Sequence, residues 1–148
     1  MVGKIKFAPG TFASLITCLI FLLLIDIIGF AFLFFITLLI FCYSFFAINN
    51  TFDKYDADDP QEIVIDEVAG QLLTLLSIPI FEILYPISKV YYCLAAFILF
   101  RIFDIWKPFP ISYIDNNVKG ALGIMIDDIV ASIFAISVLT VIFFFLGG

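Results

Sequence analysis

Long apolar runs broken by short polar segments are the main pattern in this sequence. Between Thr11 and Ile48 the only charged residue is Asp26, which is soon followed by Gly29. This run is too long for one membrane-spanning helix, because about 20 apolar residues cross the hydrocarbon core of a bilayer. It predicts two spans connected as a tight helical hairpin, with a first helix over about 11–25 and a turn between Asp26 and Gly29.

A polar stretch over 49–62 separates this hairpin from the next apolar run. It ends in Asp59-Pro60-Gln61-Glu62, a pattern typical of a helix start, with an aspartate N-cap and a glutamate that completes a capping box. A third helix is expected to begin there, which places Asp66 and Glu67 about two turns inside it. Pro79 is expected to kink or end this helix, because proline lacks a backbone N–H.

The last apolar runs predict two further helices. The fourth covers about 89–106 and is stopped by Pro108 and Pro110. A short interfacial segment over 110–117 follows, and the fifth helix runs from 124 to 146. The whole pattern therefore predicts an all-α fold, an integral membrane helical bundle of about five transmembrane helices.

Composition agrees with a membrane protein. Hydrophobic residues make up 64% of the chain, charged residues only 14%, and the mean hydropathy is +1.22. The 148 residues are expected to form a single transmembrane domain, 1–148, without a separate soluble module. The net charge of −6 argues against binding to nucleic acid, which requires a basic face. The cysteines lack a paired spacing and are interpreted as small core residues: Cys18, Cys42 and Cys93.

The basic residues indicate the orientation of the chain. If the N-terminus is cytoplasmic, five spans place all basic residues except Lys89 on the cytoplasmic side. The chain is thus predicted to be a multi-pass protein that begins in the cytoplasm and ends outside. In this topology, acids from three helices share one depth near the cytoplasmic surface: Asp66, Glu67, Asp104, Asp127 and Asp128.

These five acids form the candidate functional site. A structural explanation exists, since acids near a helix N-terminus are stabilised by the helix dipole. Three helices that present acids in one plane are hard to explain by this effect alone, and acids within a membrane are functional candidates. An oxygen-only ligand set without histidine or cysteine suits Mg²⁺ and not zinc, and a divalent cation would relieve the repulsion between the carboxylates.

Basic and hydroxyl groups at the same depth are candidates for phosphate binding. Arg101 can bind phosphate through a bidentate fork, and Lys107 and Lys119 can bind it as point charges. The segment Pro9-Gly10-Thr11 at the start of the first helix is a candidate anion cradle, although a plain helix cap explains the same residues equally well. Arg101 and Asp104 are three residues apart, which also fits a simple intrahelical ion pair.

Missing residues narrow the possible chemistry. The chain has no histidine, which excludes a phosphohistidine mechanism. Arg101 is eight residues after Cys93, so the Cys-x5-Arg loop of cysteine phosphatases is absent too. The segment 56–60 lacks the residue that would complete an aspartyl-phosphate motif. Attack of metal-activated water on the phosphorus of a lipid phosphate is the simplest remaining route.

A family resemblance rests on four segments of the sequence: 8–15, 65–70, 100–111 and 123–131. They resemble the signature blocks of the phosphatidylglycerophosphatase A family, in the family's order along almost the whole chain. The resemblance implies a bacterial inner-membrane, Mg²⁺-dependent phosphatase that converts phosphatidylglycerophosphate to phosphatidylglycerol with an active site facing the cytoplasm. The resemblance also implies that the family's acidic motif positions correspond to the five acids of this chain, and that its basic positions correspond to Arg101 and Lys107. Lys119 stands where some relatives have histidine, which leaves its role open.

The expected mechanism divides these residues into three roles. Arg101, with Lys107, neutralises charge on the phosphoryl oxygens, and Thr11 and Lys119 are further candidates for binding phosphate. Either Asp66 or Asp128 takes the proton from the attacking water. The predicted Mg²⁺ ligands are Glu67, Asp104, Asp127 and Asp128.

A cation channel or transporter subunit is the competing interpretation, in which the acids would conduct a cation. Asp26 and Glu82 are expected at the far side of the membrane, and no chain of polar residues connects them to the cluster. A structural subunit would explain the hydrophobicity but not the coplanar acids. The sequence leaves the oligomeric state open.

Overall fold

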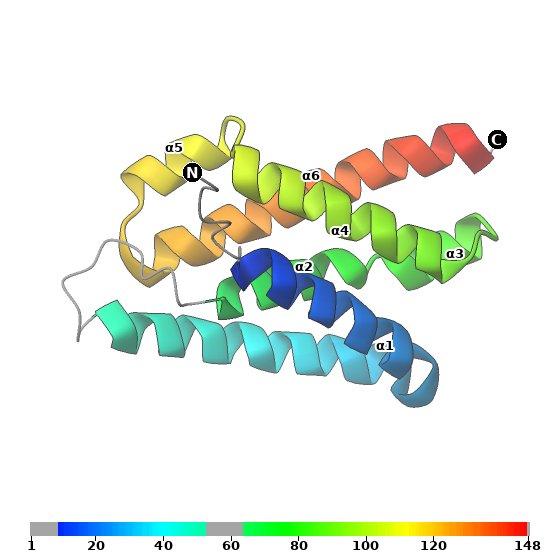
Figure 1. Ribbon diagram of the computed structural model, residues 1–148, viewed down its shortest axis with the longest axis horizontal. Helices are drawn as coiled ribbons and strands as arrows, with labels where there is room; N and C mark the ends of the chain where they lie inside the picture. Colours follow the sequence, from blue (N-terminus) through cyan, green and yellow to red (C-terminus); the bar gives the residue numbers. More distant parts are fainter. Residues whose placement is uncertain (1–8, 53–63, 148) are drawn as a thin grey trace, which may run out of the picture.

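The computed structural model describes residues 9–52 and 64–147, and all regular structure in these two ranges is helical. Figure 1 shows an elongated bundle whose longer helices run roughly along its long axis. The all-α class is therefore confirmed, whereas the expected helix start at 59–62 lies outside the described residues. The helices are α1 (Pro9–Phe52), α2 (Ile65–Leu75), α3 (Ile78–Leu84), α4 (Lys89–Trp106), α5 (Ile111–Asn117) and α6 (Gly120–Gly147).

α1 consists of two helical segments joined at a glycine. Gly29 has φ 77° and ψ 166°, a backbone conformation that residues with a Cβ rarely adopt. The chain reverses there, and the blue first half and cyan second half of α1 run in opposite directions (Figure 1). The reversal falls in the segment where the turn was expected. That each half crosses a membrane stays a prediction.

α2 begins at Ile65, so Asp66 and Glu67 lie in its first turn. The prediction that they lie about two turns inside a helix is wrong. A first-turn position suits carboxylates, because the free N–H groups and the dipole at a helix N-terminus favour negative charge. The Ser44 hydroxyl of α1, 3.2 Å from the Ile65 carbonyl oxygen, connects α1 to this start. Pro79 lies in the first turn of α3, so the helix breaks near the proline as expected.

α4 ends just before the prolines that were expected to stop it. Lys107 adopts a left-handed conformation, with φ 46° and ψ 58°, and its backbone N–H donates to the Phe103 carbonyl oxygen at 2.9 Å. The chain then forms α5, which packs against α6. α6 begins at Gly120, four residues before the expected start, and continues to Gly147.

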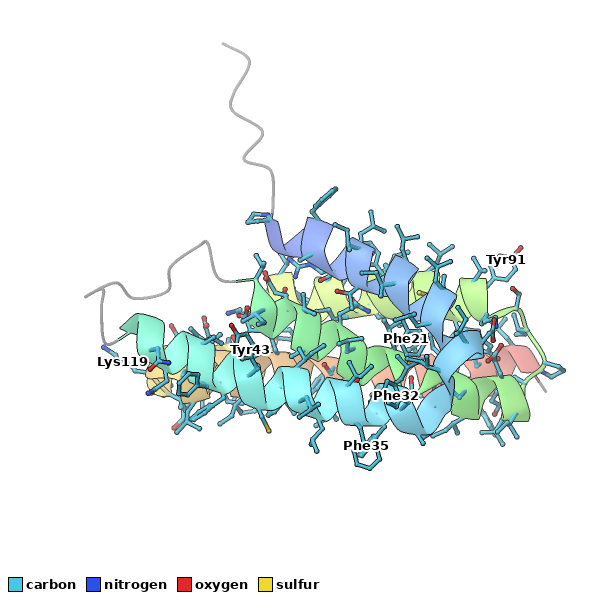
Figure 2. The ribbon with its side chains drawn as sticks, turned by 90° about the horizontal axis from the view of Figure 1, so that it is seen from below. Phe21, Phe32, Phe35, Tyr43, Tyr91 and Lys119 are labelled. Carbon is cyan, nitrogen blue, oxygen red and sulfur yellow. The ribbon has the colours of Figure 1, made fainter. Side chains whose placement is uncertain are left out.

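Large apolar side chains cover the outside of the bundle. Phe35 is 60% exposed and points away from the helices in Figure 2, whereas Phe21 is 1% exposed. Such an apolar surface fits lipid as its solvent. Among the described residues, three helical stretches are long and apolar enough to cross a membrane: Pro9–Asn50, Ile65–Leu84 and Gly120–Leu146. The count of five spans and the cytoplasmic N-terminus stay predictions.

Two polar contacts between α1 and α4 lie away from the predicted acids. Lys89, at the start of α4, forms an ion pair with Asp26, just before the turn of α1. Nearer the middle of α4, the Cys93 thiol lies 3.7 Å from the Cys18 carbonyl oxygen, and both cysteines are buried. Cys42 is exposed, so its interpretation as a core residue is wrong, because it lies on an outward face of α1.

Candidate active site

The predicted acids come together at one end of the bundle, from three helices. The first turn of α2 supplies two, the last turn of α4 supplies one, and the beginning of α6 supplies two. Asp128 is within electrostatic reach of Asp66, Asp104 and Asp127. The structure thus joins acids that are separated by more than 60 residues in the sequence: Asp66, Glu67, Asp104, Asp127 and Asp128.

A glycine and a serine allow this close approach. A Cβ on Gly70 of α2 would lie 2.7 Å from the Phe100 ring of α4 and 3.2 Å from the Asp128 Cβ of α6. The buried Ser132 hydroxyl lies 2.7 Å from the Gly70 carbonyl oxygen and 2.9 Å from the Asp128 carbonyl oxygen. These contacts fix the backbone of α6 against α2 beside the acids.

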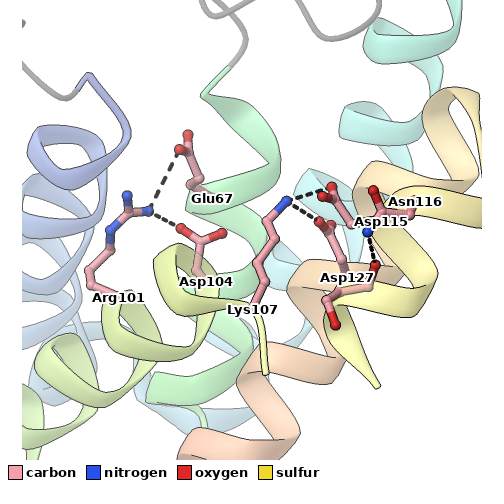
Figure 3. A network of polar contacts seen from close by, with 8 residues as sticks. Glu67, Arg101, Asp104, Lys107, Asp115, Asn116 and Asp127 are labelled. Carbon is pink, nitrogen blue, oxygen red and sulfur yellow. Dashed lines mark hydrogen bonds and ion pairs between the residues drawn. The ribbon is translucent and has the colours of Figure 1, made fainter. Parts of the chain in front are cut away.

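Arg101 connects two of these helices (Figure 3). Its guanidinium lies 2.5 Å from Asp104 on its own helix and 3.6 Å from Glu67 on α2. The intrahelical ion pair expected from the three-residue spacing is therefore present. Arg101 is 9% exposed, and its Nε has no hydrogen-bond partner within the described structure. A buried donor of this kind is available to an anionic ligand.

Lys107 joins the other part of the cluster. Its ammonium lies 2.7 Å from Asp127 of α6 and 2.6 Å from Asp115 of α5 (Figure 3). Burial alone would lower the pKa of Lys107, but the hydrogen bonds to the two carboxylates outweigh it and raise the pKa above its ordinary value. Lys107 therefore stays protonated at neutral pH. Asp115 was not predicted, because its spacing from Lys107 crosses two prolines and follows no helical period.

Three carboxylate oxygens in the cluster are buried without a hydrogen-bond partner among the described residues. Such oxygens are costly unless a cation or a ligand compensates them. However, no three acids in the described ranges already converge at the separations of a formed metal site. The donor types fit a hard divalent cation, and binding would require the side chains to turn toward it. The oxygens are Asp66 Oδ1, Glu67 Oε2 and Asp128 Oδ2.

The start of α1 borders the acids. A Cβ on Gly10 would lie 1.7 Å from Glu67 Oε1, so only glycine leaves room for this carboxylate. Thr11 and Arg101 line the same groove at the surface. One turn further along α1 and α2, the Ser14 hydroxyl and the Gln71 amide are fully buried without partners among the described residues. Sequence reasoning missed Gln71, because a single polar residue in an apolar helix carries no periodic signal.

Lys119 lies apart from these contacts. It precedes α6, is exposed, and makes none of the ion pairs found within 9–52 and 64–147. Figure 2 places it at the end of the bundle, near the end of α1. Its predicted phosphate contact stays a prediction.

Comparisons with known proteins identify the family. The family model for Phosphatidylglycerophosphatase A matches residues 1–143. Phosphatidylglycerophosphatase A of Haemophilus influenzae is 37% identical over 136 residues, which cover 92% of this chain and 79% of the relative. The protein of the same name from Escherichia coli K12 is 33% identical over 137 residues, covering 93% and 75%.

A third relative has a different name. The putative phosphatidylinositol-3-phosphatase of Bacteroides thetaiotaomicron is 32% identical over 142 residues, which cover 94% of this chain and 86% of the relative. No solved structure matches the chain. The match to the family model and the two relatives that carry the family's name span nearly the whole chain, including all five clustered acids. The chain therefore belongs to the phosphatidylglycerophosphatase A family and is a phosphoric monoester hydrolase.

Proposed function

We propose that this chain hydrolyses the terminal phosphomonoester of phosphatidylglycerophosphate to phosphatidylglycerol and phosphate, at the cytoplasmic face of a bacterial inner membrane. The observation that carries the proposal is the convergence of five acids and two basic residues, from three helices, at one end of an apolar bundle. The two relatives named phosphatidylglycerophosphatase A support the substrate. The alternative of a cation channel or transporter subunit has no support from the family.

The chain's own residues divide the chemistry as follows. Arg101, whose Nε has no hydrogen-bond partner among the described residues, binds the phosphoryl oxygens and neutralises the charge that develops on them. Asp66 or Asp128 accepts the proton of the attacking water, since each is buried and keeps one oxygen free of partners within the described structure. As the new bond from the water oxygen to phosphorus forms, the bond from phosphorus to the glycerol oxygen breaks, and that oxygen leaves as a hydroxyl with the proton that the aspartate accepted from the water.

Lys107 and Thr11 are assigned to binding and positioning. The contacts of Lys107 with Asp115 and Asp127 hold its charge beside the acids, where it adds to the attraction for a phosphate dianion. Thr11 lies at the first turn of α1, where free backbone N–H groups favour an anion. Lys119, which is exposed and precedes α6, is a further candidate for binding the phosphate.

The family chemistry also calls for Mg²⁺, and we assign its ligands to Glu67, Asp104, Asp127 and Asp128. The unpartnered oxygens of Glu67 and Asp128 support this assignment. When bound, the ion would supply Lewis acidity toward the phosphoryl oxygens and a water of lowered pKa. The carboxylates themselves would be drawn together by the ion and would lose their mutual repulsion.

A different head group is the alternative within the same reaction class. The match to the relative named as a putative phosphatidylinositol-3-phosphatase covers nearly the same share of this chain as the matches to the other two relatives. Both named substrates carry a phosphomonoester on a lipid head group, and they differ in the alcohol that carries it. The acids and basic residues described above act on the phosphate alone, so the geometry of these residues favours neither alcohol.

The test is phosphate release by the purified full-length protein in detergent. Phosphatidylglycerophosphate, phosphatidylinositol 3-phosphate and phosphatidic acid are compared, each with Mg²⁺ or with EDTA. We expect Mg²⁺-dependent release that favours phosphatidylglycerophosphate. Preference for the inositol lipid would change the substrate but keep the mechanism, and no release from any lipid by folded protein would contradict the proposal.

Metal binding has a readout that does not depend on turnover. A ligand that binds only the folded state raises the melting temperature with its concentration. We expect Mg²⁺ to raise the melting temperature of the detergent-solubilised protein, and Asp128→Asn to reduce this increase. An identical melting temperature in Mg²⁺ and EDTA would contradict the assigned ligand set.

A further inference from the structure

A groove of about 440 Å³ lies between the start of α1 and the end of α4. Two of its lining residues, Thr11 and Arg101, carry polar groups that were assigned to phosphate binding. The rest of the lining is apolar and includes Ile98, Ile102 and Trp106. The groove thus joins the candidate active site to the apolar outer surface of the bundle.

The apolar wall of the groove faces away from the core. Ile98 is 53%, Ile102 45% and Trp106 73% exposed, so this side of α4 lies where lipid surrounds a membrane protein. Ile98, Ile102 and Ile105 recur at helical spacing and form one continuous stripe. Arg101 lies beside this stripe and is 9% exposed. A ligand that contacts both must therefore have a long apolar part and an anionic part.

A second groove provides a comparison. It has about 200 Å³ and lies between the second half of α1, α2 and α6, where Phe34, Leu38 and Leu73 line it. Among the described residues, none that lines this second groove is charged. Bulk acyl chains can fill such a groove, but nothing in it selects an anionic lipid. Of these two grooves, the one between α1 and α4 combines an apolar wall with a buried cation.

We propose that the groove between α1 and α4 binds an acyl chain of the anionic phospholipid substrate and is the lateral entrance through which its phosphate reaches Arg101. The inference rests on the proposed function, because the occupant is the lipid that carries the phosphomonoester. The acyl chain stays in the groove along the isoleucine stripe. The head group turns inward past Thr11 toward the acids.

The first test uses Trp106, the only tryptophan in the sequence. Lipids with brominated acyl chains quench the fluorescence of a tryptophan that they contact. Wild-type protein is placed in nanodiscs that contain brominated phosphatidylglycerophosphate or brominated phosphatidylcholine at equal mole fraction, with EDTA present to prevent turnover. We expect at least twofold stronger quenching by the anionic lipid, and loss of this difference in Arg101→Gln.

The second test uses substitutions that make the groove narrower, with phenylalanine as the larger side chain so that Trp106 stays the only tryptophan. The double variant Ile98→Phe/Ile102→Phe is compared with Ile133→Phe/Val141→Phe, which changes two exposed positions on α6 that line neither groove. We expect kcat/KM for long-chain phosphatidylglycerophosphate to fall about tenfold in the groove variant only. A short-chain, water-soluble form of the same substrate should be hydrolysed at nearly the wild-type rate by both variants.

The outcomes separate the entrance from the reaction itself. Equal quenching by the two brominated lipids would mean that bulk lipid fills the groove, and it would overturn the inference. An unchanged kcat/KM in the groove variant, or an equal loss on long and short chains, would overturn it as well. If wild-type protein releases no phosphate from any lipid, the proposed function fails, and the quenching experiment still reports which lipid occupies the groove.

Discussion

Arg101, which is buried, and Lys107, which is partly exposed, each lie between carboxylates from two different helices. Arg101 lies between Asp104 and Glu67, and Lys107 between Asp115 and Asp127. A buried charge is tolerated when it is paired, and the removal of one partner leaves the other uncompensated. Single substitutions here therefore change both the charge of the site and the position of a neighbouring side chain.

Asp127→Asn tests the role of a single acid. The change keeps the shape of the side chain but removes a charge from Lys107 and from the assigned ligand set. We expect phosphate release to fall by about 10²–10⁴-fold, the range typical for loss of a group that acts in the reaction. The measurement is the initial rate of phosphate release at saturating Mg²⁺, with circular dichroism to verify the fold.

Asp115→Asn is the matched control for this substitution. It removes the other carboxylate that contacts Lys107, but its side chain is 44% exposed and it belongs to α5. We expect a loss of less than about tenfold, because exposed ion pairs contribute little. Near-normal activity of Asp127→Asn, or equal losses in both variants, would contradict the role assigned to Asp127.

Gly10→Ala tests the contact between α1 and Glu67. The added methyl group would occupy the position of the Glu67 carboxylate, 1.7 Å from its Oε1, and the flexible side chain must turn away. We expect phosphate release to fall by about 10²-fold, since a small displacement of a catalytic group is enough for such a loss. The melting temperature without Mg²⁺ should change little, and wild-type activity of this variant would show that the Glu67 position is not required.

Among the elements, α2 contributes most to the arrangement of the acids, because it contacts α1, α4 and α6. Its glycine determines how closely the three helices approach. The methyl group of Gly70→Ala would lie 2.7 Å from the buried Phe100 ring and 3.2 Å from the Asp128 Cβ. Neither neighbour can move freely, because Phe100 is fully buried and Asp128 is part of a helix.

We therefore expect Gly70→Ala to lower the free energy of unfolding by about 1–3 kcal/mol, the usual cost of overpacking. Unfolding in detergent with increasing denaturant measures this change. Ala31→Val, on an exposed face of α1, is the control and should stay within about 0.5 kcal/mol of wild type. A Gly70→Ala protein as stable as wild type would show that the helices can separate there without cost.

The elements were largely predictable from the sequence. Apolar runs, the glycine of the turn in α1 and the prolines after α4 each act locally, so their effect is visible in the residues themselves. The start of α2 was not predictable in this way. The pattern at 59–62 favours a helix start, yet the described part of α2 begins at Ile65, which moves Asp66 and Glu67 into the first turn.

The site was predictable in part, for a similar reason. The five acids and Arg101 are conspicuous because charge within apolar helices is costly. The contact of Gly10 with Glu67, the ion pair of Lys107 with Asp115 and the burial of Gln71 depend on how helices pack. No period or motif in the sequence contains that information.

The whole molecule has two ends with different chemistry. The end of α4, α5 and the beginning of α6 lie toward one end of the bundle, and the turn of α1 and the beginning of α4 lie toward the other (Figure 1). The acids, Arg101 and Lys107 belong to the first end, and the Asp26–Lys89 ion pair belongs to the second. The basic residues of the sequence predict that the first of these ends faces the cytoplasm. This orientation can be tested without any assay of activity.

Single cysteines in a Cys42→Ser background provide that test, because the other two cysteines are buried. We expect Ser88→Cys to react with a membrane-impermeant maleimide in intact cells. Asn116→Cys, on α5, should react only after the inner membrane is permeabilised. The reverse pattern would place the acids outside and would contradict a cytoplasmic active site.

The position of the contacts between α1 and α4 affects how lipid exchanges at this protein. The Asp26–Lys89 pair and the Cys18–Cys93 contact hold the two helices together at one end and near the middle. Toward the acids, no polar contact between α1 and α4 is found in the described residues. The two helices can therefore move apart at this end while the contacts at the other end and near the middle stay in place. Such a separation breaks no hydrogen bond or ion pair between the two helices. A lipid that enters between them displaces only another lipid. Exchange of one lipid for another at this edge should therefore have a small enthalpic barrier, whereas exchange at the opposite end would first have to break an ion pair.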